Sequence, residues 1–420
     1  MADTVQSAGV EPAAAVPLRR NRNFLALWIG AAAAFLGLSV AEIAFPLIIL
    51  ARTGSPGLVG VFALVQTGCS VVIGLPAGRL LDRYDRRVLL VLAECGRALA
   101  AASVLAALWA GHLYVAHLLA VAAVLGGLQA FGVARMLLLR SVVPGEQLTA
   151  AVTAEEVRTN AADLGGPALG GFLYGLSQLL PFAVVTATFA VSTVLALLVR
   201  VPSTPRSARP GPGERNHMFS GLLEVMREPT MRAVVLIIML VNGIAWPAQL
   251  VAVVLLQHRQ TPSWQIGLAL AGFAAGGLAG TALVKPLHRL LRPGVLLIVV
   301  VLAEVPVLLG LSSPGGLGGP VWIGAMCFAF GLGLPSIRVL IDVLIIRQIP
   351  DALRGRALGG VITLFTLSVP AGMGLSGVLL TVLAPVVVPV VLAAVLLAGL
   401  GYAASRRVIW RSRWPSDTAK

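Results

Sequence analysis

Charged and aromatic residues are both scarce in this chain of 420 residues, at 11% and 6% of its positions. A soluble globular domain carries roughly 25% charged residues, so this shortage excludes water as the main solvent of the protein. Apolar residues take their place, because 58% of the chain is hydrophobic and the mean hydropathy is +0.93. The composition therefore predicts a membrane protein.

Residues for chemistry at a metal or redox centre are also few. Cys69, Cys95 and Cys327 all lie inside apolar segments, without C-x-x-C or metal-ligand spacing. No nucleophile–base set and no phosphate-binding loop is present, so we predict no catalytic residue, no metal and no cofactor. The net charge of +14 does not favour nucleic acid as a partner, because the arginines lie in loops between apolar runs.

Apolar runs of about 20 residues recur along the chain, each long enough to cross about 30 Å of hydrocarbon as a helix. The first run exceeds the apolar region of a cleavable signal peptide, so we expect it to remain as a span. The predicted fold is an all-α polytopic membrane protein with twelve transmembrane helices. These are expected at 24–50, 57–78, 88–109, 114–138, 150–176, 181–200, 232–256, 264–284, 294–311, 319–346, 356–382 and 385–404.

The positive charges predict the orientation of these helices. Of the 31 lysines and arginines, 26 fall in the two tails, the loops that follow even-numbered spans, and the helix ends beside those loops. Because positive charge collects on the cytoplasmic side, both termini are predicted to be cytoplasmic, in the inner or plasma membrane.

A stretch rich in proline, glycine and serine interrupts the apolar pattern between the sixth and seventh spans, as in a flexible linker. An offset of 207 residues aligns Gly60 with Gly267 and Arg140 with Arg347, which favours two bundles related by a pseudo-two-fold axis. The predicted organisation is a cytoplasmic tail (1–23), a six-helix bundle (24–200), a cytoplasmic linker (201–231), a second six-helix bundle (232–404) and a cytoplasmic tail (405–420).

The loop after the second span has a charged pattern, Gly78-Arg-Leu-Leu-Asp82-Arg83-Tyr-Asp85-Arg86-Arg87. It resembles the G-x-x-x-D-R-x-x-R-R loop of the major facilitator superfamily, although a loop that merely obeys the positive-inside rule is the alternative. The resemblance implies a gating role in which Asp82 interacts with Arg356 or with the start of the eleventh helix. The predicted gating residues are Gly78, Asp82, Arg83, Arg86, Arg87 and Arg356.

The fifth span contains Gly166-Pro167-Ala168-Leu169-Gly170-Gly171, which resembles the G-P-x-x-G-G antiporter motif of drug exporters in that superfamily. Proline bends a helix and glycine lets another helix approach, so a purely structural kink is the alternative interpretation. In the eighth span, Gly272, Gly276 and Gly280 predict the place where the two halves meet. Thr53-Gly54-Ser55 and other stretches resemble a branch that includes siderophore and macrolide exporters.

Ionisable residues inside the bilayer are costly, so each is a functional candidate. The candidates are Glu42, Glu94, Arg97, Arg135, Asp163, Glu304, Arg338 and Asp342. Glu94 and Arg97 are three residues apart and are expected to pair locally. Arg338 and Asp342 are four residues apart, and either local pairing or a role in transport fits their spacing.

Glu42 is the first candidate for proton coupling, because no basic residue lies within a helical turn or two of it. A carboxylate withdrawn from water without a cation favours its protonated form, which suits proton exchange. Asp342 and Asp163 are the next candidates, and Asp163 has a local hydrogen bond as its alternative. The alternative to proton coupling by Glu42 is that it is simply a polar residue lining a water-filled cavity.

The family resemblance implies a central cavity lined mainly by the first, fourth, seventh and tenth spans. The expected substrate-cavity residues are Glu42, Arg135, Asn242, Trp246, Gln249, Arg338 and Asp342. A mostly apolar wall suits an amphipathic organic molecule, such as an antibiotic, a siderophore or a related metabolite. The resulting hypothesis is a monomeric exporter driven by the proton gradient. Nutrient uptake is the alternative, followed by a membrane enzyme or a lipid-handling protein.

Overall fold

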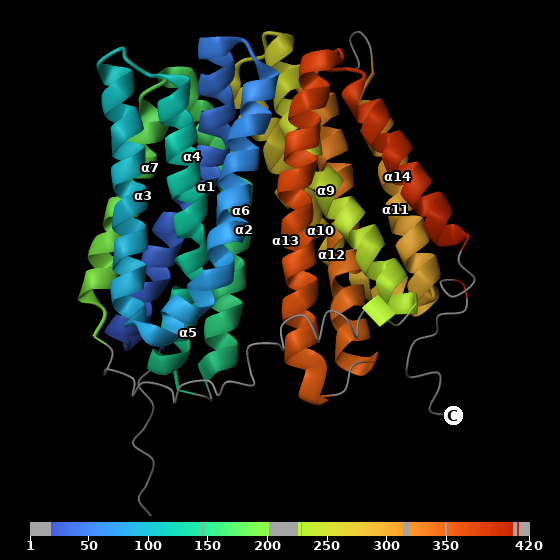
Figure 1. Ribbon diagram of the computed structural model, residues 1–420, viewed down its shortest axis with the longest axis horizontal. Coiled ribbons are helices and arrows are strands. Elements are labelled where there is room, and N and C mark those ends of the chain that lie inside the picture. The colour runs from blue at the N-terminus through green and yellow to red at the C-terminus, as the bar shows by residue number, and fades with distance from the viewer. Residues whose placement is uncertain are drawn as a thin grey trace, which may run out of the picture.

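A computed structural model of the protein describes residues 18–144, 147–200, 226–227, 229–313, 319–348, 351–405 and 410. Every regular element in these residues is a helix (Figure 1). Ten of the described segments are long and apolar enough to cross a membrane, and Val388–Ala404 is a shorter apolar helix. The chain is therefore a multi-pass helical membrane protein.

The helices fall into two sets in sequence and in space, with blue-to-green helices on one side of Figure 1 and yellow-to-red helices on the other. The N-terminal set follows η1 (Leu18–Arg20) and comprises α1 (Arg22–Thr53), α2 (Pro56–Arg83), α3 (Arg86–Trp109), α4 (Val115–Gln129), η2 (Ala130–Gly132), α5 (Val133–Val142), α6 (Leu148–Leu176) and α7 (Leu180–Leu198). The C-terminal set comprises α9 (Pro229–His258), α10 (Ser263–Leu290), α11 (Pro293–Leu311), α12 (Pro320–Gln348), α13 (Asp351–Val382) and α14 (Val388–Ala404).

Polar caps decide where several helices begin and end. The side chain of Asn21 accepts hydrogen bonds from the N–H groups of Asn23 and Phe24, both at 3.1 Å, and so starts α1. Asp85 accepts from the N–H of Arg87 at 2.7 Å and starts α3. Gly54 ends α1 with φ at 63°, a left-handed conformation that glycine adopts without strain. These caps satisfy backbone groups that have no partner within the helix.

The fourth span was expected as one helix over 114–138, but the structure divides it. The 3₁₀ turn η2 separates α4 from α5, so the backbone pattern of α4 stops at Gln129. On α3, Nη2 of Arg97 donates to the carbonyl oxygen of Leu128 at 2.8 Å. A buried guanidinium therefore satisfies a carbonyl beside the break, which lipid could not do.

The two sets touch mainly at two helix crossings, α2 against α13 and α6 against α10, with smaller contacts of α9 with α1 and α2. A Cβ added to Gly377 would lie 2.8 Å from Cα of Gly60, and one added to Gly171 would lie 2.9 Å from Cα of Gly267. We call the end where α1 begins the tail end and the opposite end the far end. Since α2 and α10 begin at the far end, both crossings close the molecule there.

The expected meeting place at Gly272, Gly276 and Gly280 was wrong. These glycines of α10 face α12 within the C-terminal set, where added Cβ atoms would meet the backbone near Phe328 and Leu332. Gly267, which does meet the other set, precedes Gly272 by five residues and so lies about 140° around the helix. The glycine stripe packs the C-terminal set internally, and a different face of α10 reaches α6.

Candidate functional site

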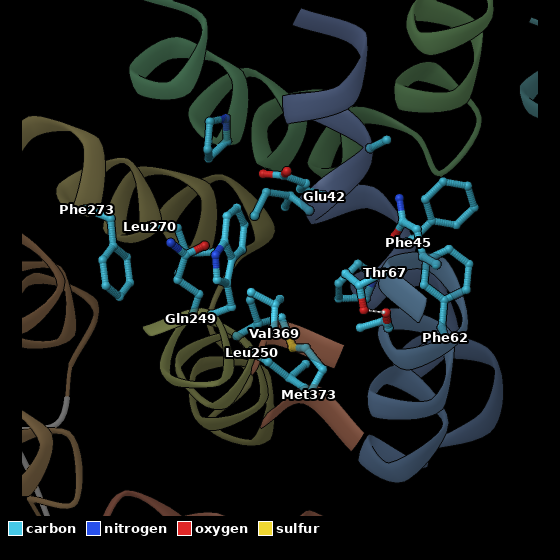
Figure 2. Close-up of a pocket in the computed structure, with 18 of the residues that line it drawn as sticks. Glu42, Phe45, Phe62, Thr67, Gln249, Leu250, Leu270, Phe273, Val369 and Met373 are labelled. Carbon is cyan, nitrogen blue, oxygen red and sulfur yellow. Dashed lines mark hydrogen bonds between the residues drawn. The ribbon is translucent and has the colours of Figure 1, made fainter. Parts of the chain in front are cut away.

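A cavity of about 620 Å³ lies between the two sets, with walls contributed by α1, α2, α4, α6, α9, α10, α12 and α13 (Figure 2). The expectation of a lining from the first and seventh spans agrees with the contributions of α1 and α9. The fourth and tenth spans also contribute, with Gln129 of α4 and Leu334 of α12 in the described lining. Large parts of the wall come from α2, α10 and α13 as well.

Two carboxylates face this cavity. Glu42 points into it from α1, as Figure 2 shows, and Asp163 lines it from α6. Both side chains are exposed, although they lie between helices deep in the protein. They are near enough to interact electrostatically. The fold therefore brings together two carboxylates that lie 121 positions apart in the sequence.

Amides and hydroxyls supply the other polar points of the wall. Asn242, Trp246 and Gln249 of α9 line the cavity, as expected from the sequence. The remaining polar lining residues were not expected from the sequence: Gln66, Thr67, Ser70, Gln129 and Thr366. A detectable signal existed, since Gln66 and Ser70 are four residues apart in an otherwise apolar run and so share one face of α2.

Aromatic side chains form much of the apolar wall. The rings of Phe45 and Phe62 stack with their centroids 4.7 Å apart. On the opposite side, the ring of Phe273 meets Phe330 edge-on at 5.6 Å. Trp246 is 39% exposed, so its indole is available to a molecule in the cavity. The wall thus offers ring faces as well as carboxylates.

Arg135 belongs to a buried ionic network and is not among the described lining residues. Oε1 of Glu94 accepts from Nη1 of Arg97 at 3.2 Å and from Nη2 of Arg135 at 3.0 Å. Nη2 of Arg135 also donates to Oγ of Ser192 at 2.8 Å. The predicted pairing of Glu94 with Arg97 is confirmed. The guanidinium of Arg135 joins α5 to α3 and α7 instead of reaching into the cavity.

One other candidate is not part of the described cavity wall, and three have side chains outside the described residues. The side chain of Arg338 is exposed on α12 and is not in the described lining. The side chains of Asp82, Asp342 and Arg356 lie outside the described part of the structure, which includes only their helical backbone. The three therefore remain predictions.

The charged loop after α2 has two structural roles in addition to its expected gating role. Asp85 caps α3, as described above. Arg87 donates from Nε to the carbonyl of Ala196 at 3.4 Å and from Nη2 to the carbonyl of Leu197, near the end of α7. These bonds satisfy late carbonyls of α7 and tie it to α3. Among the described residues, no atom lies within 4 Å of a Cβ added to Gly78, so no close helix contact is described there.

The glycines and proline of 166–171 bring α6 against two helices at once. Gly166 and Gly170 face Ser39 and Val40 of α1, whereas Gly171 faces Gly267 of α10. Pro167 lies next to the same α10 contact and also lines the cavity. The motif therefore joins the Asp163 side of the cavity to one of the two far-end crossings.

A cavity between two sets of membrane helices, with carboxylates and amides in its wall and helix contacts closing one end, is the architecture of a membrane carrier. The family model of the Major Facilitator Superfamily matches residues 27–373. The chain belongs to this superfamily and is a transporter rather than an enzyme.

Curated relatives of similar length are exporters. The chain is 28% identical over 386 residues to the multidrug efflux pump Tap of Mycobacterium tuberculosis, covering 86% of this chain and 88% of that protein. It is 27% identical over 351 residues to the enterobactin exporter EntS of Citrobacter koseri, covering 81% of each. These similarities extend over most of the transporter.

Solved structures of transporters share the fold at low sequence identity. A bacterial homolog of the human lysosomal transporter Spinster, in an inward-facing and unoccupied conformation, aligns with a TM-score of 0.73 and 15% identity. The alignment covers 94% of this chain and 99% of that one. The nucleoside transporter NupG aligns with a TM-score of 0.72 and 12% identity, covering 94% of this chain and 100% of that one.

Proposed function

We propose that this transporter exports a small amphipathic organic molecule in exchange for protons, by alternating access. The observation that carries the proposal is the placement of Glu42, beside Asp163, in a cavity that the two far-end crossings close. A carboxyl in such a cavity is exposed to one side of the membrane while the far end is closed. It becomes exposed to the other side when the far end opens and the tail end closes. The similarity to a multidrug efflux pump and to a siderophore exporter favours export over uptake.

The proposed architecture has twelve spans in two six-helix bundles, 24–200 and 232–404. If α4, η2 and α5 are counted as one span, the described elements make six spans in each set, which supports this division. The proposal keeps residues 201–231 as the cytoplasmic linker and residues 1–23 and 405–420 as cytoplasmic tails, although most of these residues lie outside the described part of the chain. In this orientation the tail end faces the cytoplasm, in agreement with the excess of arginine and lysine there.

We infer that the structure represents an inward-open state, because the crossings at Gly60 and Gly267 close the far end. The resemblance to an inward-facing solved structure supports this assignment. Asp82 and Arg356 would then act in the opposite state, when the tail end closes. Asp82→Asn should slow transport and leave expression intact. Distances across the cytoplasmic gate, measured by double electron–electron resonance, should widen in the variant, and unchanged distances would remove Asp82 from gating.

Protons and cargo are proposed to alternate at the carboxylates of the cavity. Glu42 is the primary site, with Asp163 as its neighbour and Asp342 as a further candidate. An ionised carboxylate is costly to enclose in a cavity that is closed to water on both sides. A proton or the cargo must therefore neutralise it before the cavity opens to the opposite side of the membrane. This requirement couples cargo movement to proton movement in opposite directions.

The test is Glu42→Gln in proteoliposomes with an imposed pH difference. The variant should bind cargo and allow downhill exchange, but it should lose accumulation against a gradient, because glutamine cannot release a proton. Glu304→Gln is the matched control, since it makes the same change at a buried carboxyl of α11 away from the cavity. Full pH-driven accumulation by Glu42→Gln would eliminate the assignment. Proton-driven accumulation into right-side-out vesicles, with none into inverted ones, would favour uptake.

A further inference from the structure

A second cavity lies at the far end, beside the crossing of α6 with α10. Its volume is about 360 Å³. The described wall comes from the end of α1, from the end of α9 with the turn that follows it, and from the start of α10: Leu47, Leu50, Ala51, Gln257, Gln260, Thr261, Ser263 and Ile266. None of these residues lines the central cavity. We call this second cavity the far-end pocket.

The far-end pocket belongs to the closed conformation of the far end, because its two sides come from different sets. The α1 side is part of the N-terminal set, whereas α9 and α10 are part of the C-terminal set. Ser263 also takes part in the crossing, since a Cβ added to Gly171 of α6 would meet its carbonyl oxygen. Opening the far end would separate the two sides of the wall. A molecule that binds between them therefore stabilises the closed far end.

The wall of the far-end pocket is polar but uncharged. Half of its eight described residues carry amides or hydroxyls: Gln257, Gln260, Thr261 and Ser263. Arg52 and Arg259 lie next to wall residues in the sequence without belonging to the described wall, and Nη2 of Arg259 donates to the carbonyl of Ser313 at 3.0 Å. An ion in the pocket would give up water without a countercharge in that wall, which is costly. A neutral molecule with several hydroxyls would exchange water for groups that both donate and accept.

The two glutamines of this wall are placed at some cost. Oε1 of Gln257 is buried and has no hydrogen-bond partner among the described residues. Gln260 has a φ of 57°, in the left-handed region that a helix end normally gives to glycine or asparagine. An amide without a donor gains a hydrogen bond when it turns towards one, and backbone strain of this kind is concentrated at binding sites. Both observations point to a ligand that supplies hydrogen-bond donors.

The far-end pocket lies beyond the closed end of the central cavity, on the same face of α9. Gln249, Val253 and Gln257 recur at four-residue intervals, and the first two line the central cavity. Gln257 is about 12 Å further along the helix than Gln249. Ala51 and Gln260 are exposed, so the pocket is accessible from the surface of the far end. Its ligand therefore enters from the side of the membrane opposite the tail end.

We propose that the far-end pocket binds an uncharged polyhydroxylated molecule of the sugar type, and that its occupation holds the far end closed. Hydroxyls would bond to Gln257, Gln260 and Ser263, while a C–H face of the ring packs on the leucines of α1. The volume, near the lower end of the roughly 300–1,000 Å³ typical of small-molecule sites, fits one or two sugar rings. The regulatory part of this inference rests on the proposed alternating access, because the closed far end must be one of two states.

The first test measures binding of methyl α-glucoside to the purified full-length transporter. Lipid nanodiscs free of sugar-based detergent hold the protein, and saturation-transfer nuclear magnetic resonance detects the ligand. The typical binding energy per atom of a small ligand gives an expected dissociation constant of about 1 mM. Methyl α-glucuronide has the same ring with a carboxylate. It should bind at least about tenfold more weakly, because the wall offers this charge no partner.

The second test measures closure of the far end. Gly60→Ala places a Cβ against Cα of Gly377 in the other crossing, so it should populate an open far end without changing a residue of the pocket wall. Gly60→Leu replaces it if the far end stays closed. Double electron–electron resonance between spin labels across the far end then reports both states. At ten times its dissociation constant, a ligand that binds only the closed state should raise the closed-to-open ratio about elevenfold.

Variants of the wall separate a ligand-binding role from a structural one. Gln260→Gly should keep or raise the melting temperature, because glycine adopts this φ without strain, yet it should weaken sugar binding about threefold to tenfold. Gln257→Leu should weaken binding by a similar factor. Gln265→Leu makes the same change on α10 outside the described wall, so it should leave the dissociation constant unchanged. Full affinity in both Gln260→Gly and Gln257→Leu would contradict the site, even if the sugar bound elsewhere.

Other results would also overturn the inference: no detectable binding of the glucoside, equal binding of the glucuronide, or a closed-to-open ratio that the glucoside leaves unchanged or lowers. Closure by glucosyl diacylglycerol in the nanodisc, with none by methyl α-glucoside, would place the ligand in the membrane and contradict a soluble one. The export proposal is judged separately, by pH-driven movement of cargo in proteoliposomes. Binding and closure without such movement would contradict proton-coupled export and leave the far-end pocket intact, whereas movement without binding would do the reverse.

Discussion

Replacing Glu94 tests whether the buried ionic network of the N-terminal set carries an excess positive charge. Two guanidinium groups, from Arg97 and Arg135, donate to the same carboxylate oxygen at 3.2 and 3.0 Å. The side chains of Glu94, Arg97 and Arg135 are 1%, 3% and 16% exposed. Glu94→Gln removes the carboxylate that both cations share. Breaking a buried ion pair in this way costs about 3–5 kcal/mol of unfolding free energy.

The geometry also predicts that Arg135→Met lowers the unfolding free energy less than Glu94→Gln does. Because both guanidinium nitrogens touch one oxygen, they lie at most about 6 Å apart, and at an effective dielectric constant of about 20 their repulsion is about 3 kcal/mol. Arg135→Met removes this repulsion together with the attraction to Glu94, and it leaves a neutral pair with Arg97. We therefore expect a loss near 1–2 kcal/mol, part of it from the hydrogen bond to Ser192.

The assay is denaturant unfolding of purified variants in detergent micelles, analysed as a double-mutant cycle with melting temperatures as a second measurement. Glu94→Gln should be the least stable single variant. Adding Arg135→Met to Glu94→Gln should restore part of the loss, because one of the two cations that shared the carboxylate is gone. The reasoning would be refuted if Arg135→Met alone were as damaging as Glu94→Gln, or if the double variant were less stable than Glu94→Gln.

Two further predictions concern packing and a second buried carboxyl. Gly267→Ala places a Cβ against the carbonyl oxygen of Pro167, so distances between spin labels across the far end, measured by double electron–electron resonance, should lengthen. Gly68→Ala is the control and should leave these distances unchanged, because an added Cβ there meets no described atom within 4 Å. An unaltered far end in Gly267→Ala would contradict the closing role of this crossing. Glu304 is 2% exposed and both of its carboxylate oxygens lack a hydrogen-bond partner among the described residues, so Glu304→Gln should keep or raise the melting temperature. A clear fall in melting temperature would indicate a partner that needs the carboxylate.

The apolar runs predicted where helices cross the membrane better than where they end. The second span was expected over 57–78, but α2 continues to Arg83, and the eighth, expected over 264–284, continues to Leu290. Hydropathy marks the part of a helix that lipid covers, whereas hydrogen bonding extends the helix into the polar surface until a cap or a break stops it. Asp85 is such a cap, and its effect on α3 depends on a side-chain bond that hydropathy does not measure.

Local spacing predicted the partner of Glu94 on its own helix but not the partner from another span. Arg97 is three residues away on α3, and this separation alone indicates the pair. Arg135 is 41 residues away and reaches Glu94 only because α5 packs against α3 just after the break at η2. The break itself was not predicted, since the run over 118–138 is apolar except for Gln129 and Arg135 and contains no proline.

The contrast between Glu42 and Glu94 shows which part of the site depends on tertiary packing. Both are glutamates in long apolar helices. Glu94 has one arginine within a helical turn, Arg97, and Glu42 has none. Packing against α5 gives Glu94 a second cation and removes it from solvent, so it acts as a brace within the N-terminal set. Packing against α6 gives Glu42 a second carboxylate, Asp163, in an accessible cavity. A carboxylate bonded to two cations is part of the internal packing of its helix set, whereas one that faces a second carboxylate in an open cavity is accessible to a proton or to cargo. The neighbours supplied by other helices therefore distinguish the structural role of Glu94 from the coupling role that we propose for Glu42.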